Sequence, residues 1–180
     1  MIIKGKNITL VQLLCLALYY SFARYLPDSN SGIKFGNQIR RYLCKRIFKK
    51  CGSKVMIHRG ANFGIGINIE IGDYSDIGVN AVIPSDTIIG NYVLMAPNCY
   101  IFASNHNFEN INIPIKMQGS SKKRQTIIDD DVWIGQNVTM TPGRHIKKGT
   151  IIGACCVLTK DYPEYSIIGG NPSKLIRSRK

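Results

Sequence analysis

The chain has 180 residues, with 24 Lys and Arg against 11 Asp and Glu, and a formal net charge of +13 at pH 7. This length allows one domain with a substantial core plus an appendage. The charge is concentrated at one end, because residues 1–54 hold 11 Lys and Arg and a single acid, Asp28. Basic residues interleaved with aromatics over the rest of the chain are missing, so we expect no nucleic-acid partner.

Residues 1–54 are expected to form a basic and apolar helical segment. Residues 8–23 are mostly apolar and follow Lys4 and Lys6. This run is shorter than the roughly 20 residues of a membrane span, and it lacks the cleavage site of a signal peptide. Ile39, Leu43 and Ile47 then keep helical spacing, and Gly52 is expected to end that helix. The cations of this second helix are Arg40, Arg41, Lys45, Arg46, Lys49 and Lys50.

Two interpretations of residues 1–54 stay open. The two helices could lie in the interface of the anionic cytoplasmic leaflet, making a peripheral membrane contact through residues 1–50. Alternatively, they could form a cap that closes the end of the following domain or packs against a neighbouring subunit.

Between Ile65 and Leu158 an aliphatic residue returns at every sixth position, with one interruption. A period of six fits neither an α-helix nor an alternating strand, and it is typical of a prism of short parallel strands in which three repeats make one coil. We therefore predict a mainly β fold over residues 55–168, in which stacked coils bury an aliphatic column. The residues of this ladder are Ile65, Ile71, Ile77, Ile83, Ile89, Met95 and Ile101, then Ile134, Met140, Ile146, Ile152 and Leu158.

The six cysteines form no CxxC pair and no regular framework. Cys99 and Cys156 stand two positions before a ladder residue, where Cys serves as a small apolar side chain. Cys155 must then face outward. Reduced thiols in a cytoplasmic protein are the expectation.

The phase of the ladder breaks between Ile101 and Ile134, whose separation in sequence is three positions off a multiple of six. We predict an extruded loop over about residues 107–125, which contain Pro, Gly, Ser and a Lys-Lys-Arg run. Long excursions from a compact scaffold are often functional.

His106, at the expected root of that loop, is the predicted catalytic residue. A neutral imidazole can accept a proton near pH 7, and a loop that leaves a rigid prism would both expose and position it. The alternative is a solvent-facing loop histidine. His58 and His145 lie within repeats and are interpreted as surface residues. No short His spacing or Cys cluster is present, so we expect no metal site.

Four stretches carry a resemblance to a known family: IGNYVLMAPN (89–98), NHNF (105–108), IIDDDVWIGQNVTMTPG (127–143) and IIGACCVLTKDYPEYSIIGGNPSKLIR (151–177). Over about residues 55–177 the chain resembles the left-handed parallel β-helix acyltransferases. The closest are the acetyl-CoA-dependent sugar O-acetyltransferases, which include galactoside and maltose acetyltransferases and the enzymes that acetylate O-antigen and capsule. The resemblance implies a left-handed parallel β-helix of hexapeptide repeats.

The resemblance also assigns roles. His106 would be the general base that takes the proton of a sugar hydroxyl as its oxygen attacks acetyl-CoA, in a direct transfer without an acyl-enzyme. Trp133 would line the channel near the pantetheine end. Gly135 and Gln136, in the next turn, would supply donors to the oxyanion. Relatives often have Ser or Ala in place of Gln136, so its backbone N–H is the better candidate.

The same resemblance suggests where coenzyme A would bind. Gly153 and Ala154 would leave room for the pantetheine arm. Residues 169–180 would complete the site as a C-terminal tail. The positions that match the adenine and phosphate end are Thr159, Lys160, Lys174 and Arg177.

For the acceptor, the resemblance points to Asp76 and, less strongly, to Asn80 and Asn105. Asp76 and Asn80 could equally be corner residues, since Asp and Asn favour turns. Glu109 is near enough in sequence to orient His106.

The family is trimeric, with active sites between neighbouring prisms, so we expect a homotrimer. The expected function is O-acetylation of a sugar in a bacterial surface glycan or its precursor, in the cytoplasm and at the inner face of the inner membrane. The alternatives are a small acceptor, such as serine, an antibiotic or a free sugar, and a non-catalytic repeat scaffold.

Overall fold

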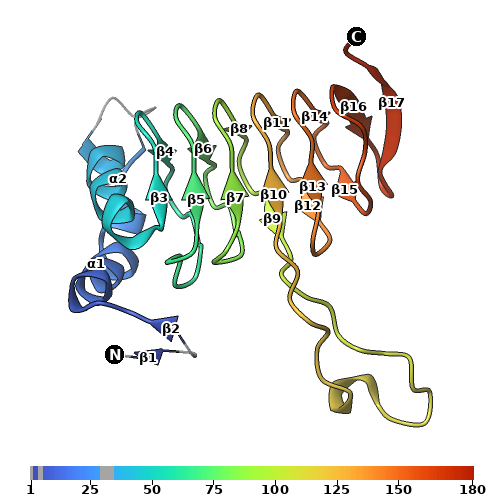
Figure 1. Ribbon diagram of the computed structural model, residues 1–180, viewed down its shortest axis with the longest axis horizontal. Coiled ribbons are helices and arrows are strands. Elements are labelled where there is room, and N and C mark those ends of the chain that lie inside the picture. Colours follow the sequence, from blue (N-terminus) through green and yellow to red (C-terminus); the bar gives the residue numbers. More distant parts are fainter. Residues whose placement is uncertain (1, 4–5, 29–34) are drawn as a thin grey trace.

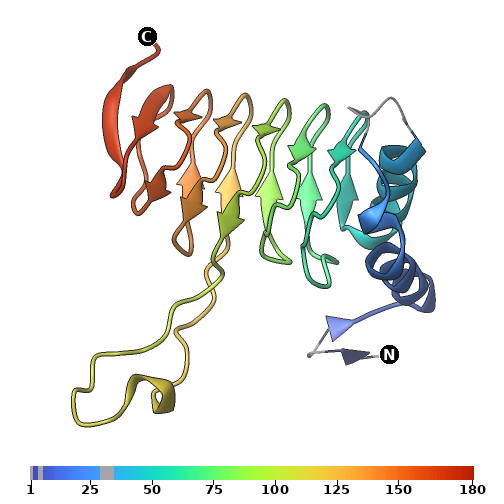
Figure 2. The ribbon, with the colours of Figure 1, turned by 180° about the vertical axis from the view of Figure 1, so that it is seen from behind.

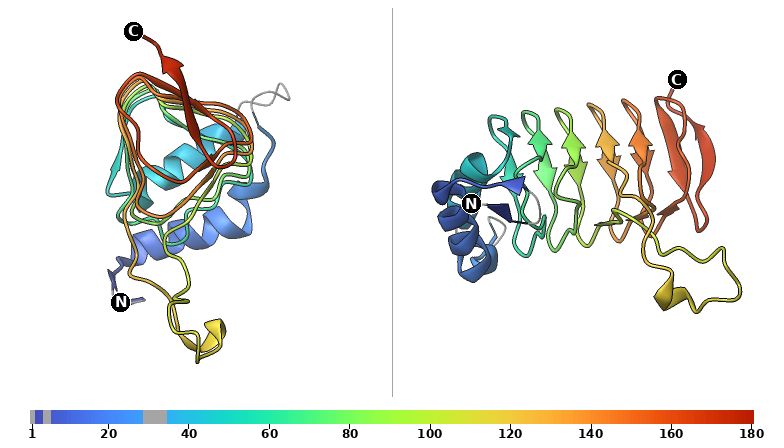
Figure 3. Two further views of the ribbon diagram at one scale, coloured as in Figure 1. Left: turned by 90° about the vertical axis from the view of Figure 1, so that its right-hand side faces the viewer. Right: turned by 60° about the horizontal axis from the view of Figure 1, so that its bottom comes forward.

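The computed structural model describes residues 2–3, 6–28 and 35–180. Most of them form a prism of stacked coils, with two helices across its N-terminal end and one long loop leaving its side (Figures 1 and 2). Viewed down its long axis, the coils superpose as a triangle (Figure 3). The predicted fold class, a left-handed parallel β-helix with an N-terminal helical segment and one extruded loop, is confirmed.

Each coil runs along three faces, mostly as short strands; on the third face the first two coils contribute the bridge residues Asn62 and Val82. The first face contains β3 (Lys50–Cys51), β5 (Glu70–Ile71), β7 (Ile88–Ile89), β10 (Ile127–Ile128) and β13 (His145–Ile146). The second face contains β4 (Met56–Ile57), β6 (Asp76–Ile77), β8 (Leu94–Met95), β11 (Trp133–Ile134), β14 (Ile151–Ile152), β16 (Ser166–Gly169) and β17 (Lys174–Ser178). The third face contains β9 (Tyr100–Ile101), β12 (Thr139–Met140) and β15 (Val157–Leu158).

The strand register explains the six-residue period. Glu70 pairs with Ile88, and Ile127 with His145, so each partner lies three repeats further along the chain and three faces make one coil. In the two-residue strands from β4 to β15 the second residue points inward and is buried, whereas the first is more exposed. Full burial of one such aliphatic side chain contributes about 1.5–3 kcal/mol to folding. The column of Ile, Met and Leu is therefore the core of the prism.

The start of the ladder differs from the prediction. Asn62 pairs with Val82, so Phe63 stacks on Ile83 in the inward column. The separation of Asn62 and Val82 is two positions more than three repeats, so the first coil is two residues longer than a regular coil. Phe63 is fully buried, whereas Ile65 is only half-buried in the corner between Gly64 (φ 59°) and Gly66 (φ 66°). Ile65 is therefore not part of the column. After the loop, the ladder resumes at Ile128, one repeat before Ile134.

Corner residues take the left-handed conformation. Asn80, Asn98 and Asn137, with φ of 55°, 59° and 58°, stack at the corner between the second and third faces. Asn80 Nδ2 donates to Asn98 Oδ1 (3.3 Å), and Asn98 Nδ2 donates to Asn137 Oδ1 (3.2 Å). Asn tolerates this backbone conformation better than most residues. Asn80 is thus a corner residue whose amide is already used within the prism.

Two helices cap the first coil. They are α1 (Leu10–Ser21), which begins with a capping box between Thr9 and Gln12, and α2 (Phe35–Ile47); η1 (Ala23–Tyr25) follows α1. The hairpin of β1 (Ile2–Ile3) and β2 (Lys6–Asn7) precedes them. The fully buried Tyr19 of α1 donates to Ala61 O (3.0 Å), and burial raises the pKa of its hydroxyl well above the ordinary value. The helices thus pack as a cap, in agreement with the second interpretation of this segment.

Gly52 does not end the second helix. The helix ends at Ile47, and Gly52 follows β3 at a coil corner. A Cβ at Gly52 would lie 2.6 Å from the carbonyl carbon of Gly72 in the next coil. Gly52 is required by the close stacking of coils.

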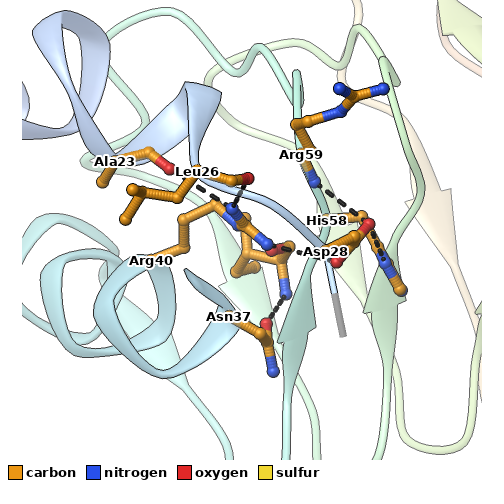
Figure 4. A network of polar contacts seen from close by, with 8 residues as sticks. Ala23, Leu26, Asp28, Asn37, Arg40, His58 and Arg59 are labelled. Atoms are coloured by element: carbon orange, nitrogen blue, oxygen red, sulfur yellow. Dashed lines mark hydrogen bonds and ion pairs between the residues drawn. The ribbon is translucent and has the colours of Figure 1, made fainter. Parts of the chain in front are cut away.

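Arg40 fastens the cap to the first coil (Figure 4). Its side chain is completely buried, and its Nη2 lies 3.1 Å from Asp28 Oδ1. Its Nε and Nη1 donate to three backbone carbonyls, those of Ile57, Ala23 and Leu26. Arg40 is therefore an internal residue and does not belong to a solvated basic face.

Asp28 extends this network to the second face. His58 Nδ1 lies 2.8 Å from Asp28 Oδ2, and the His58 side chain is only 15% exposed, so His58 is not the surface residue that the sequence suggested. Burial alone would raise the pKa of Asp28, but His58, the Arg59 N–H and Arg40 outweigh it and hold that pKa below its ordinary value. The sole acid of the N-terminal segment thus stays ionised against two basic side chains.

Within the described ranges, no helix has the length and apolar character needed to cross a bilayer.

Candidate active site

An antiparallel ribbon carries His106 away from the prism. Ile88 pairs with Ile127. Their separation in sequence is much larger than the usual three repeats, because the loop enlarges this coil. Arg124 N donates to Ala103 O (3.0 Å), and Asn107 N donates to Gly119 O (3.1 Å). The excursion therefore begins near Ala103, earlier than the predicted residue 107. His106 lies on the outgoing arm, bridged to Ser120, and not at the junction with the prism.

Hydrogen bonds brace the ribbon and its tip. Ser121 bonds to the backbone of Asn105 twice, from its N–H to Asn105 O (2.8 Å) and through its Oγ to Asn105 N (3.0 Å). At the tip, beside η3 (Ile115–Met117), Gln118 Nε2 donates to the carbonyls of Asn110 (2.8 Å) and Ile113 (2.7 Å). The backbone that presents His106 is consequently ordered on both sides.

His106 differs from the other two histidines in its surroundings. Its side chain is exposed, and no described residue makes a hydrogen bond or ion pair with its ring. His58 Nδ1 is bonded to Asp28, whereas His145 is bonded through Nε2 to Asp129 (3.0 Å) and through Nδ1 to Lys147 (2.9 Å). Glu109 is exposed as well and makes no bond with His106 in the described chain. Only His106 thus keeps both ring nitrogens available for chemistry.

Trp133 lies in an outward row on the second face. It pairs with Leu94 on one side and Ile151 on the other, and its side chain is 50% exposed. Asp76 stands in the same row on β6, which contacts β8, so it is a strand residue and not a corner residue. Burial raises the pKa of Asp76, against a smaller lowering effect of His58. The row is therefore an apolar surface that contains a single carboxyl group.

The corner after Trp133 exposes two backbone donors. Gly135 N and Gly153 N donate within the prism, to Ile152 O and Ile168 O, both at 2.8 Å. The next residues, Gln136 and Ala154, are exposed, and their N–H groups have no acceptor among the described residues. A Cβ at Gly135 would lie 2.6 Å from Ala154 N, so Gly135 allows these coils to stack closely. The free donors are thus those of Gln136 and Ala154, and the Gly135 N–H is not available to an oxyanion.

Ser173, which the sequence reasoning did not single out, organises the C-terminal candidates. It is buried, and its Oγ accepts from Thr159 N (3.2 Å) and lies 3.1 Å from the hydroxyl of Tyr162. Thr159 is thereby placed beside Lys174, the next residue on β17. In the sequence, Ser173 could have been found as the Ser of the GNPSK stretch.

The two outer cations of this region are less constrained. Lys160 Nζ lies 5.5 Å from the centre of the Tyr162 ring, and the Arg177 Nη1 donates to Ser178 O (3.0 Å). Both side chains are exposed at the C-terminal end of the prism. The turn that contains Asn171 and Pro172 reverses the chain between β16 and the antiparallel β17.

A single chain does not bring His106 together with Trp133, Gln136 or Ala154. The loop leaves from the corner between the third and first faces, whereas β8, β11 and β14 form the second face, on the opposite side of the triangle (Figures 1 and 3). Asp76, Trp133, Gln136 and Ala154 lie on or beside that second face. The predicted site residues therefore fall into two separate groups.

Among the residues that the structure describes, no three His, Cys, Asp or Glu side chains are close enough to hold a metal ion.

The chain is similar to a family model and to several named proteins. Residues 125–160 match the family described as "Bacterial transferase hexapeptide (six repeats)". Galactoside O-acetyltransferases from Lactococcus lactis subsp. lactis (strain IL1403) and Escherichia coli (strain K12) are each 30% identical to it, over 139 and 140 residues. These matches cover 75% and 77% of this chain and span 65% and 68% of the relatives' own lengths.

A further relative is the "Putative lipopolysaccharide biosynthesis O-acetyl transferase WbbJ" of Escherichia coli (strain K12), 34% identical over 127 residues, which are 64% of this chain and 62% of that protein. Among solved structures, a galactoside acetyltransferase in complex with coenzyme A has a TM-score of 0.76 and 26% identity. That superposition covers 94% of this chain and 81% of the other. On its repeats, its fold and these matches, the chain belongs to the hexapeptide-repeat acetyltransferase family.

Proposed function

We propose that the protein is an acetyl-CoA-dependent O-acetyltransferase that acts on a sugar hydroxyl of a bacterial surface glycan or its precursor. The observation that carries this proposal is the exposed His106 ring, which no described residue bonds, on a hydrogen-bonded ribbon. Relatives named galactoside O-acetyltransferase and lipopolysaccharide O-acetyl transferase support the sugar acceptor.

In this mechanism His106 is the general base. Its imidazole takes the proton of the acceptor hydroxyl while that oxygen attacks the thioester carbonyl carbon of acetyl-CoA. The new C–O bond gives a tetrahedral oxyanion, which collapses by breaking the C–S bond. The coenzyme A thiolate then recovers the proton from the imidazolium, so the reaction needs no metal and no acyl-enzyme.

The oxyanion requires donors that are fixed before the reaction. The Gln136 N–H has this property, since it points out of a rigid coil corner and has no acceptor in the described chain. Ala154 N–H, one coil further, would bond a pantetheine carbonyl. Trp133 would lie against the pantetheine end, and Gly153 would leave space for the arm.

The charged end of coenzyme A would bind at the C-terminal end of the prism. Thr159 and Lys174, joined through Ser173, offer a hydroxyl and an ammonium group side by side. Lys160 and Arg177 add two exposed cations near them. We assign these four side chains to the adenine and phosphate groups.

We also propose a homotrimer in which His106 of one subunit faces the second face of the next. This arrangement would unite the two groups of site residues that one chain keeps apart. Two exposed apolar surfaces support it: the second-face row with Leu94 (53% exposed) and Trp133, and the loop tip with Ile111 (93%) and Met117 (76%). Asp76 and Asn105 would then line the acceptor position, and the enzyme would work in the cytoplasm on membrane-linked precursors.

Replacing the base tests this function. We expect His106→Ala to lower turnover by about two orders of magnitude or more, because a positioned base contributes roughly 10²–10⁴-fold. Thiol release from acetyl-CoA with sugar acceptors measures turnover, and titration calorimetry measures coenzyme A binding, which should stay near the wild-type value. His145→Ala, at an imidazole bonded to Asp129 and Lys147 outside the site, is the matched control. Undiminished turnover of His106→Ala would refute the mechanism.

A further inference from the structure

The outer side of α1 is an apolar surface that nothing in the described chain covers. Cys15 and Tyr19 are buried on its inner side, toward α2 and the first coil. The outer side consists of side chains that are 55–72% exposed, and α1 contains no charged residue. We call these residues the α1 outer surface: Leu10, Val11, Leu14, Leu18, Phe22 and Tyr25.

Their spacing makes this one continuous surface. Leu10, Leu14 and Leu18 follow each other at four-residue intervals, and Val11 and Phe22 lie beside them on the same side of the helix. A contiguous exposed apolar patch of this kind marks a site of contact with a membrane or a protein. With 12 residues, α1 is too short to cross a bilayer but can lie along its surface.

The last turn of α2, which carries exposed cations, lies beside the first turn of α1. Gln12 Nε2 donates to Ile47 O (3.3 Å), which places the first turn of α1 beside the end of α2. Lys45 and Arg46, in that last turn of α2, are exposed and take part in no ion pair with a described residue. Arg46 instead lies over the exposed ring of Tyr42, 3.6 Å from its centre.

The α1 outer surface could contact a second copy of the chain or a membrane, and the charge of residues 1–54 favours the membrane. Residues 1–54 carry 11 Lys and Arg and one acid. A second copy docked through its own α1 would bring two such segments together, and their like charges would oppose contact. A bilayer with anionic lipids offers the opposite charge at its surface and an apolar interior just below it.

We propose that the α1 outer surface docks on a bilayer that contains anionic lipids. The helix lies in the interface with its leucines among the acyl chains, and Lys45 and Arg46 bind lipid phosphates. The docking needs neither acetyl-CoA nor an acceptor, so it is independent of the proposed activity. It would hold the enzyme where membrane-linked glycan precursors are made.

Vesicle flotation of the full-length protein tests the proposal. One set of vesicles contains phosphatidylcholine alone, and the other also contains phosphatidylglycerol. We expect the wild-type protein to float with the anionic vesicles, and Leu14→Glu/Leu18→Glu to lower its partition at least about tenfold, since charges then enter the apolar interface. Both leucines are exposed, so the fold is retained; circular dichroism checks this.

Two further variants separate the contribution of the cations from that of the leucines and control for a charge placed elsewhere on the surface. Lys45→Gln/Arg46→Gln should lower partition into anionic vesicles by roughly fivefold for each charge removed, with a weaker salt dependence. Tyr100→Glu, at an outward and exposed position of the third face, is the matched control and should float like the wild type. Each variant's thiol release is measured in parallel, so that loss of membrane binding is distinguished from loss of catalysis.

Three outcomes would overturn the proposal. The first is that the wild-type protein fails to float with anionic vesicles. The second is that Leu14→Glu/Leu18→Glu floats as well as the wild type. The third is that light scattering gives Leu14→Glu/Leu18→Glu a smaller oligomer than the wild type has. The last result would show that a second copy covers the α1 outer surface.

Discussion

Arg40 and His106 are both basic side chains, and the fold uses them in opposite ways. Arg40 has no exposed surface, and its guanidinium is bonded to Asp28 and to backbone carbonyls from the cap and the first coil. His106 is exposed, and in the described chain its ring is bonded to nothing. The first is a structural contact, and the second is a group available for proton transfer.

Removing the guanidinium should therefore destabilise the cap. Arg40→Met keeps the length of the side chain but removes the guanidinium donors from buried carbonyls and the ion pair with Asp28. We expect the free energy of unfolding to fall by about 3 kcal/mol, the usual scale for breaking a buried pair. Arg41→Met, at the neighbouring half-exposed position, should change it little. Urea denaturation measures both, and equal stability of the two variants would contradict the structural role of Arg40.

These residues also show what could be read from sequence. His106 could be found because it interrupts a repeat, and a break in periodicity is visible in the sequence alone. Arg40 could not, because a helix rich in Arg and Lys normally presents them to solvent, and the acceptors that bury Arg40 come from other segments. The same holds for His58, whose partner Asp28 is 30 residues away.

At the scale of the element, the six-residue period predicted the faces, the inward column and the loop. It misplaced Ile65, since the extra residues of the first coil lie in a corner that itself contains an Ile-Gly pair. Ile65 precedes Ile71 by one full repeat, so the insertion leaves the apparent phase intact. Only strand register reveals that Phe63, not Ile65, fills the column.

Close stacking of coils gives a prediction for Gly72. A Cβ there would lie 2.6 Å from the backbone of Gly90, which neither coil can avoid by a rotamer change. We expect Gly72→Ala to cost about 1–3 kcal/mol, a common penalty for overpacking, and to lower Tm by several degrees. At Gly153 the nearest atom is 3.3 Å from the added Cβ, so Gly153→Ala should be milder. Calorimetry that ranked the two variants in the reverse order would contradict this account of the corners.

At the scale of the whole molecule, the two groups of site residues lie on opposite sides of one prism. His106 extends from the corner between the third and first faces, whereas Trp133, Gln136 and Ala154 belong to the second face. The sequence shows that all of these residues belong to one repeat array. It does not show which subunit of an oligomer supplies each residue of a given active site. We infer a site shared between subunits only from the structure, which shows how far His106 lies from the second face of its own chain.

Mixed oligomers test this central claim most directly. His106→Ala removes the base, and Ala154→Trp fills the expected pantetheine groove at an exposed position, so each variant alone should be inactive. When both are co-expressed with different tags and the hybrids are purified, a shared cleft can combine an intact His106 with an intact Ala154. Each purified mixed trimer then contains one intact cleft among its three, so activity returns to about a third of the wild-type value, measured as thiol release. If each site were built within one chain, every site would carry a defect and the hybrids would stay inactive, which would contradict the account.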